Sequence, residues 1–201
     1  IKLNKRIKNL KQINKIDIYT SHHTHYVIGT GANDPQKMDP RASRETLDHS
    51  IMYIFAVALE DGKWHHIKSY TKSRAKRKST IKLWRSIKTH EEKKWTKKYH
   101  DPNPKNKSFG AKVIVTLKNR KKFSEQLDRA DAHPFGARPF KRENYINKFL
   151  TLTKDIVSKQ ESKRFLKTVQ KIKNLNAGQL YKLNIQIKKS KIKQNNKEGI
   201  F

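Results

Sequence analysis

Three side chains in the segment 39–59 could perform acid–base chemistry on a single ligand. His49 and Tyr53 are four residues apart and Thr46 precedes His49 by three, so all three would share one face of a helix. The small Ala56 continues that face and leaves room for a ligand. An imidazole, a phenol and a hydroxyl could there supply a base, an acid and a hydrogen-bond donor. The same spacing also fits a histidine and a tyrosine that pack at a helix boundary, which is the simpler interpretation of spacing alone.

A second group of titratable side chains is formed by His22, His23 and His25. β-Branched, aromatic and aliphatic residues recur at alternate positions between residues 16 and 28, which predicts a strand. On a strand, His23 and His25 point to the same side and could bind a metal ion. Because no cysteine or carboxylate stands nearby at ligand spacing, and Asp34 lies across a turn, we predict no metal site. We interpret the group as a polar strand beside a cleft.

Two further segments contain turn-forming residues that could approach a ligand. Gly29-Thr30-Gly31 begins like a dinucleotide-binding loop, but the third glycine is missing and Asp34-Pro35 stands where a helix should open. We reject that function, although the small residues would still let the backbone approach an anion. The segment 133–140 contains prolines and aromatic residues, which a rigid crossing between domains would explain. Arg138 within it could also meet a carboxylate.

The segment that carries Thr46, His49 and Tyr53 is expected to be a helix from Asp39-Pro40 to about Leu59. Aspartate is a favoured N-cap and proline suits the first turn. Asp61-Gly62 should end this helix, because glycine tolerates the left-handed conformation of a C-cap. The basic stretch that follows, residues 65–98, carries scattered apolar residues and is expected to form one or two helices.

Downstream, the period of the apolar residues changes from two to three or four. Residues 111–117 alternate as a strand, and the polar turn 118–121 leads into a returning strand at 123–127. After Pro139 the apolar residues recur every three or four positions, which indicates helices. We therefore expect an α+β fold in which residues 16–28 and 111–117 belong to one antiparallel sheet.

This change of period divides the chain into three parts. Residues 1–132 are expected to form an α+β domain and residues 133–187 a helical segment. Residues 188–201 form a lysine-rich tail that is expected to be disordered. The helical segment is too short to bury a core of its own, so it needs other chain to pack on.

Composition limits the class of protein. The 201 residues include no cysteine, which excludes disulfides, cysteine nucleophiles and iron–sulfur clusters and is consistent with the cytoplasm. No apolar run is long enough to span a membrane. The formal net charge of +31 suggests a basic nucleic-acid-binding protein. The lysines are spread along the whole chain without a base-reading module, so we favour compositional drift and expect polyanion binding to be nonspecific and salt-sensitive.

Four segments in order give the chain its resemblance to a known family. The segments are YTSHHTHYVIGTGANDP (residues 19–35), RETLDHSIMY (residues 44–53), YHDP (residues 99–102) and AHPFGAR (residues 132–138). Their order and spacing, from about residue 16 to residue 187, resemble the 2-methylcitrate dehydratases of the MmgE/PrpD family. Each motif is weak alone, but four in order are specific.

The resemblance implies a two-domain, homodimeric hydro-lyase in which residues 1–132 are a lid and residues 133–187 return to a large helical domain. Such enzymes convert 2-methylcitrate to 2-methyl-cis-aconitate in the methylcitrate cycle of propionate catabolism, without metal or other cofactor. Relatives act on cis-aconitate and iminodisuccinate. The substrate is therefore expected to be a tricarboxylate.

The resemblance also suggests roles for individual residues. Tyr53 corresponds to the lid tyrosine of the family's site, and we expect it to act in proton transfer with the support of His49. We assign substrate binding to Thr46, His23, His25 and Arg138. The remaining site residues of the family, an aspartate, a threonine, a histidine and a lysine, lie upstream of Ile1, in an amino-terminal half that we expect to be missing here. The alternatives are a basic nucleic-acid-binding protein and an inactive truncated remnant of the dehydratase.

Overall fold

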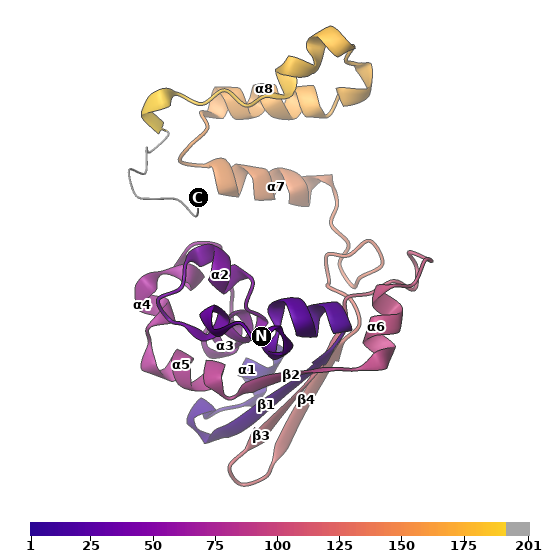
Figure 1. Ribbon diagram of the computed structural model, residues 1–201. Helices are drawn as coiled ribbons and strands as arrows, with labels where there is room; N and C mark the ends of the chain where they lie inside the picture. Colours follow the sequence, from indigo (N-terminus) through magenta and orange to yellow (C-terminus); the bar gives the residue numbers. More distant parts are fainter. Residues whose placement is uncertain (192–201) are drawn as a thin grey trace. The chain divides into compact units, whose positions relative to one another are not determined.

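The computed structural model describes residues 1–191 and is built around a four-stranded mixed sheet (Figure 1). The strands lie in the order β2-β1-β3-β4. Strand β1 runs parallel to β2 and antiparallel to β3, which in turn is antiparallel to β4. Their bounds are β1 (Ile13–Thr20), β2 (Ile87–Glu91), β3 (Ala111–Leu117) and β4 (Lys122–Leu127). The predicted strand at 111–117 and its returning partner are confirmed.

Helices and short helical turns connect the strands. The helices here are α1 (Lys2–Arg6), α2 (Arg44–Asp48), α3 (Ile51–Asp61), α4 (Lys72–Ala75), α5 (Lys78–Arg85) and α6 (Lys93–Tyr99). The 3-10 turns are η1 (Leu10–Gln12), η3 (Thr30–Ala32), η4 (Pro35–Met38) and η5 (Lys68–Tyr70), and η2 (Thr24–Ile28) is a π-helical turn. Gly62 takes the left-handed conformation, with φ of 64°, and ends α3 as the sequence predicted.

The core lies between one face of the sheet and the helices. Ile16, Ile18 and Val115 point from the sheet towards the helices and are at most 1% exposed. Tyr53 and Trp84 meet them from α3 and α5, with ring centroids 5.0 Å apart in an edge-to-face arrangement. Alternation on the strands and one apolar side on each helix are therefore sufficient to build a closed core.

The predicted strand at 16–28 is wrong beyond Thr20. The Ser21 hydroxyl accepts a hydrogen bond from the Thr24 amide (3.3 Å), and the Ser21 carbonyl accepts one from the His25 amide (2.9 Å). A serine that caps helical amides in this way turns an alternating segment out of the sheet. His23 and His25 consequently lie in a helical turn and not side by side on a strand.

The expected helix from Asp39 to Leu59 is two helices with a break at His49 and Ser50. Ser43, not Asp39, caps α2 by accepting the Thr46 amide at 3.2 Å. The hydroxyl of Ser50 accepts the Tyr53 amide (3.3 Å) and donates to the carbonyl of Lys37 (2.8 Å), so it begins a new helix.

The expectation of helices alone between residues 65 and 98 is also wrong, because β2 lies within this stretch. Ile87 and Thr89 are buried, whereas Lys88 is exposed, so the segment alternates as a strand does. It pairs parallel to β1, with Ile16 opposite Ile87 and Thr20 opposite Glu91. The α+β class is confirmed, but the sheet is mixed and not purely antiparallel.

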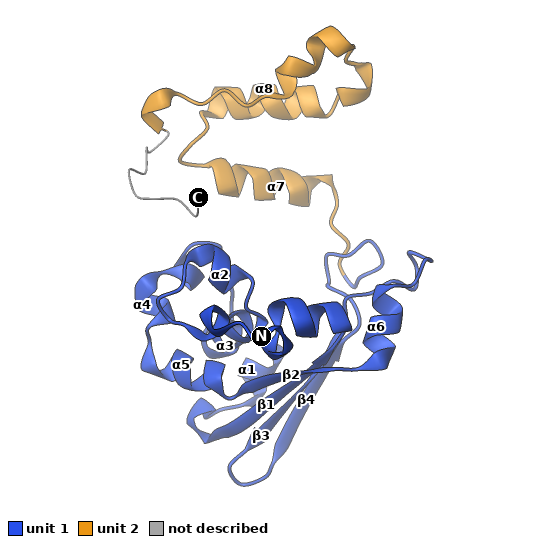
Figure 2. Ribbon diagram, viewed as in Figure 1, with its two compact units in different colours: residues 1–137 blue, residues 138–201 orange. Residues whose placement is uncertain are grey.

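The chain separates into two compact units, unit 1 from Ile1 to Ala137 and unit 2 from Arg138 onwards (Figure 2). Unit 2 contains α7 (Arg142–Thr153), α8 (Lys159–Val169), η6 (Ile172–Asn174), η7 (Ala177–Leu183) and η8 (Lys189–Lys191). The helices predicted after Pro139 are therefore confirmed. Of the tail expected to be disordered, η8 is described and residues 192–201 lie outside the described residues.

Candidate functional site

The three residues that sequence spacing grouped, Thr46, His49 and Tyr53, do not share one helix face. His49 is the exposed C-cap of α2, and its Nδ1 donates a hydrogen bond to the carbonyl of Glu45 at 2.8 Å. Thr46 is half-buried in α2, whereas Tyr53 belongs to α3. The break at Ser50 therefore separates the imidazole from the phenol, and His49 caps its own helix.

Tyr53 is a core residue of unit 1. Its exposed fraction is 0%, and its hydroxyl donates to the carbonyl of Ser69 at 2.5 Å. Burial raises the pKa of Tyr53 to about 12, although the nearby charge of Arg74 acts in the opposite direction. The phenol is thus protonated at neutral pH and occupied by a backbone acceptor. Proton transfer by Tyr53 stays a prediction that this placement does not favour.

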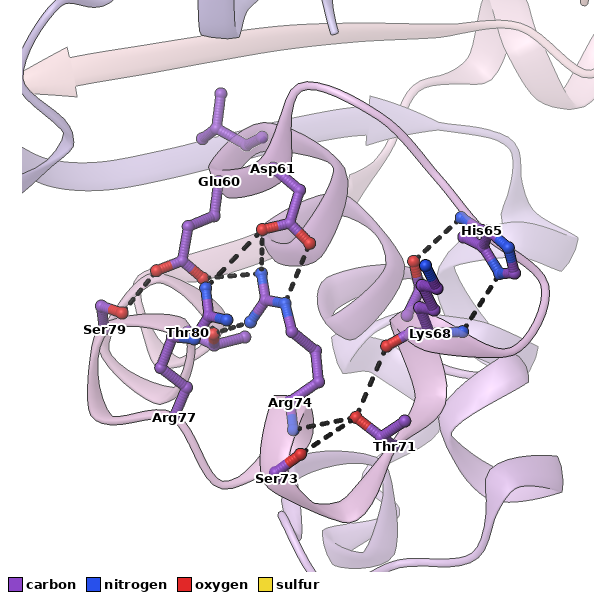
Figure 3. A network of polar contacts seen from close by, with 12 residues as sticks. Glu60, Asp61, His65, Lys68, Thr71, Ser73, Arg74, Arg77, Ser79 and Thr80 are labelled. Atoms are coloured by element: carbon purple, nitrogen blue, oxygen red, sulfur yellow. Dashed lines mark hydrogen bonds and ion pairs between the residues drawn. The ribbon is translucent and has the colours of Figure 1, made fainter.

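A network of polar contacts links α3, α4 and α5 (Figure 3). The guanidinium of Arg74, 5% exposed, contacts the carboxylates of Glu60 (2.8 Å) and Asp61 (2.9 Å). In the loop before η5, Nδ1 of His65 accepts two backbone amides, one of them that of Lys68 at 3.1 Å. Both carboxylates are paired with Arg74 and His65 holds backbone amides, so these contacts fix the loop and do not form an open site.

A different group of side chains gathers where the parallel strands β1 and β2 end. Both carboxyl ends lie at the same edge of the sheet, with Thr20 opposite Glu91. The chain leaves β1 through Ser21 and the helical turn that carries His22, His23 and His25. The carboxyl ends of neighbouring parallel strands are a frequent place for ligand sites. We call these three histidines, together with Thr89, Glu91, Thr96 and Tyr99, the histidine cluster.

His25 contacts Thr89 of β2, and two glycines leave space for this pair. Its Nδ1 lies 2.7 Å from the hydroxyl of Thr89, which also accepts the Thr30 amide at 2.9 Å. A Cβ on Gly31 would lie 2.5 Å from Nε2 of His25, and one on Gly29 would lie 2.5 Å from the Thr89 hydroxyl. The Gly-Thr-Gly segment is therefore explained by close packing against this pair, and not by a nucleotide.

His22 and His23 are exposed on the outer side of the same turn. Nδ1 of His22 donates to the carboxylate of Glu91 at 3.0 Å, and the Thr96 hydroxyl donates to the other oxygen at 2.9 Å. The ring of His23 stacks on Tyr99 of α6, with centroids 5.0 Å apart. Helix α6 thus orients both histidines. The YHDP motif (residues 99–102) therefore lies beside the motif of residues 19–35.

The protonation states in the cluster differ. Partial burial lowers the pKa of His25, and the neighbouring His90 and His22 act in the same direction and outweigh the opposite effect of Glu91, which favours the neutral imidazole at pH 7. Hydrogen bonds from His22 and Thr96 hold the pKa of Glu91 below its ordinary value. A neutral imidazole beside an imidazole paired with a carboxylate can supply a base and a hydrogen-bond donor to one anionic ligand.

Sequence reasoning found part of this cluster. It grouped His22, His23 and His25, but it missed the contributions of Thr89, Glu91 and Thr96, because it expected helices where β2 lies. The alternation of residues 87–90 was a signal for that strand. Arg138 is an exposed residue of unit 2, and its substrate role stays a prediction.

Within residues 1–191, no three or more side chains of His, Cys, Asp or Glu are grouped so as to hold a metal ion. None of the helices in that range has the length and apolar character of a membrane span.

Comparison with known proteins identifies a family that the chain matches over most of its length. A family model described as the MmgE/PrpD C-terminal domain matches residues 1–174. The match includes the histidine cluster, both halves of the broken helix and α7 and α8 of unit 2.

Proposed function

The chain belongs to the MmgE/PrpD family, and on that premise we propose that it is the carboxy-terminal part of a hydro-lyase that dehydrates 2-methylcitrate to 2-methyl-cis-aconitate. The reaction would serve the methylcitrate cycle of propionate catabolism in the cytoplasm. The matched model describes a carboxy-terminal domain, which supports the view that another part of the enzyme completes the active site. By the same resemblance we propose a homodimer.

The observation that carries this proposal is the histidine cluster at the carboxyl ends of β1 and β2. Dehydration breaks a C–H bond next to a carboxylate and a C–O bond to a tertiary hydroxyl, and the hydroxyl leaves as water after it receives a proton. The reaction therefore needs a base, an acid and groups that bind three carboxylates. Exposed His22 and His23 and half-buried His25 are such groups, held on one turn.

We assign each histidine a role from its contacts. His22, which donates through Nδ1 to Glu91, presents its other ring nitrogen to a substrate carboxylate. His25 is neutral and supported at Nδ1 by Thr89, so its Nε2 can exchange a proton or donate a hydrogen bond. His23, stacked on Tyr99, binds a second carboxylate. Thr46, His49 and Tyr53 take no direct part in this proposal.

The test uses the chain expressed together with the segment encoded upstream of the Ile1 codon. We expect this protein to dehydrate 2-methylcitrate, measured by the ultraviolet absorbance of the new conjugated double bond. His25→Asn keeps a polar group near Thr89 but removes Nε2, and it should lower turnover by about a hundredfold. His133→Asn, outside the cluster, is the matched control and should leave turnover unchanged.

Two results would contradict the proposal. Equal turnover of the His25 and His133 variants would show that the histidine cluster is not part of the active site. Failure of the parent protein to dehydrate 2-methylcitrate would show that this compound is not its substrate.

Tyr53→Phe is a third variant. A loss of about a hundredfold with unchanged stability would restore the predicted role of Tyr53 in proton transfer. Loss of stability with unchanged turnover would identify it as a packing residue.

A further inference from the structure

A hollow of unit 1 lies at the opposite end of the β1–β2 pair from the histidine cluster. The cavity measures about 570 Å³ and is bounded by η1, the first residues of β1, and α5, with Ser86 just before β2. Cavities of roughly 300–1,000 Å³ are the size that small-molecule ligands occupy in proteins. We call this hollow the basic groove, and none of its lining residues belongs to the histidine cluster.

The floor of the basic groove is apolar. Ile13 of β1 and Leu83 of α5 line it and are each 5% exposed, while Leu10 and Ile81 are half-buried beside them. Ile13 and Leu83 belong to the core, so the floor is fixed by the packing of the unit. An apolar ligand surface placed on this floor would lose its contact with water at little conformational cost.

The rim of the basic groove is cationic. Lys78, Lys82 and Arg85 are spaced four and three residues apart, so they form one stripe along α5, and Lys11 faces the groove from η1. All four are exposed, and within residues 1–191 none of them has an ion-pair partner. This differs from Arg74, whose charge is compensated by the carboxylates of Glu60 and Asp61.

One acidic residue, Glu60, lines the same groove, but its charge is already compensated. Its carboxylate accepts hydrogen bonds from Arg74 Nη2 (2.8 Å) and the Thr80 hydroxyl (2.5 Å), and also from the hydroxyl of Ser79 (Figure 3). Burial opposes ionisation of Glu60, but these hydrogen bonds and the charge of Arg74 outweigh it and lower its pKa. The four cations therefore set the potential of the rim.

We propose that the basic groove binds a small anionic amphiphile, with an apolar body on the floor and a carboxylate at the rim. A tricarboxylate lacks the apolar body that this floor would cover, so the ligand class differs from that of the histidine cluster. The groove is a ligand site of its own, and its occupancy does not depend on the dehydratase activity.

The test uses octanoate as the probe, titrated into the full chain and followed by methyl NMR. Shifts should be confined to Leu10, Ile13, Ile81 and Leu83. The double variant Lys78→Glu/Lys82→Glu should weaken binding by about tenfold. The matched control Lys159→Glu/Lys163→Glu changes the net charge equally, with the same four-residue spacing on an exposed helix of unit 2, and should bind octanoate as the parent does.

Three outcomes would overturn the proposal. Equal weakening by both double variants would show attraction to the overall charge of the chain. Binding of 1-octanol as tightly as octanoate would show an apolar hollow in which the rim has no function. Citrate shifting the same methyl signals with equal affinity would show a site for anions without an apolar body.

Discussion

Units 1 and 2 differ in how much apolar surface each buries by itself. Unit 1 encloses a core in which Ile16, Tyr53 and Trp84 are fully buried. Among the described residues of unit 2, Val157 is the single buried apolar side chain, and Tyr145 and Ile172 are more than half exposed. Unit 1 therefore supplies the stability that a positioned site requires, whereas the apolar contacts of unit 2, such as Phe149 stacked on Phe165, are half-buried.

The polar contacts of the two units differ in the same way. In unit 1, Arg74 is 5% exposed between two carboxylates, whereas Arg164 in unit 2 is 34% exposed beside Glu161. Arg164 also donates to the carbonyl of Lys182 at 2.8 Å and so fastens η7 to α8. A buried charge without its partner is far more costly than an exposed one. Substitutions at matched positions can measure this difference.

The largest effect is expected from Arg74→Leu. It leaves Glu60 and Asp61 without their common partner, and unfolding of unit 1 should become easier by about 3–5 kcal/mol. All three tryptophans lie in unit 1, so denaturant unfolding followed by tryptophan fluorescence reports on it. Arg164→Leu should cost unit 2 about 1 kcal/mol or less. Similar losses for both would show that burial does not decide the cost of losing the arginine.

A matched pair of isoleucines tests the difference in core packing. Ile16→Ala removes a fully buried side chain and should cost about 2–5 kcal/mol, because the cavity left in the sheet cannot close completely. Ile172→Ala removes a side chain that is 53% exposed and should stay within about 0.5 kcal/mol of the parent. Denaturant midpoints by circular dichroism and fluorescence measure both, and a costly Ile172 variant would mean that unit 2 has a core after all.

The smallest effect is expected in the dependence of the stability of unit 2 on acidic pH. A hydrogen bond from Arg164, then one from the Gln186 amide, lowers the pKa of Glu161 from 4.5 to about 2, against a small opposing effect of burial. The folded form therefore binds fewer protons, so this stabilisation is complete above about pH 4.5 and is lost as pH falls towards about 2. The amide signal of Gln186 in NMR should titrate near pH 2, and Glu161→Gln should abolish the titration. Titration near 4.5 would contradict the pairing.

Local sequence patterns predicted some elements correctly because the conformation of these elements does not depend on residues distant in sequence. The hairpin of β3 and β4 follows from alternation and a polar turn, and Gly62 ends α3 because of its left-handed backbone. Helices α7 and α8 follow from their apolar spacing. In each case the residues that decide the conformation lie within one or two turns of the chain.

The arrangement of the histidine cluster could not be predicted from the alternation of apolar and polar residues. Ser21 caps a helical turn, and this capping outweighs the strand pattern that continues through Thr24 and Tyr26. Strand β2 is five residues long and is stabilised by pairing with β1, which is distant in sequence. Because β2 positions Thr89 and Glu91, the sequence could predict the histidines of the site but not their arrangement with these two residues.

The most direct test of the account is a titration of 2-methylcitrate into the chain, followed by NMR of its nine histidine rings at constant ionic strength. The account predicts that the signals of His22, His23 and His25 shift with one common affinity, while those of His65 and His133 stay unchanged. Similar shifts of all nine signals would show diffuse attraction to a basic protein. That result, or shifts of other rings in place of the three predicted ones, would contradict the assignment of the histidine cluster as the substrate site.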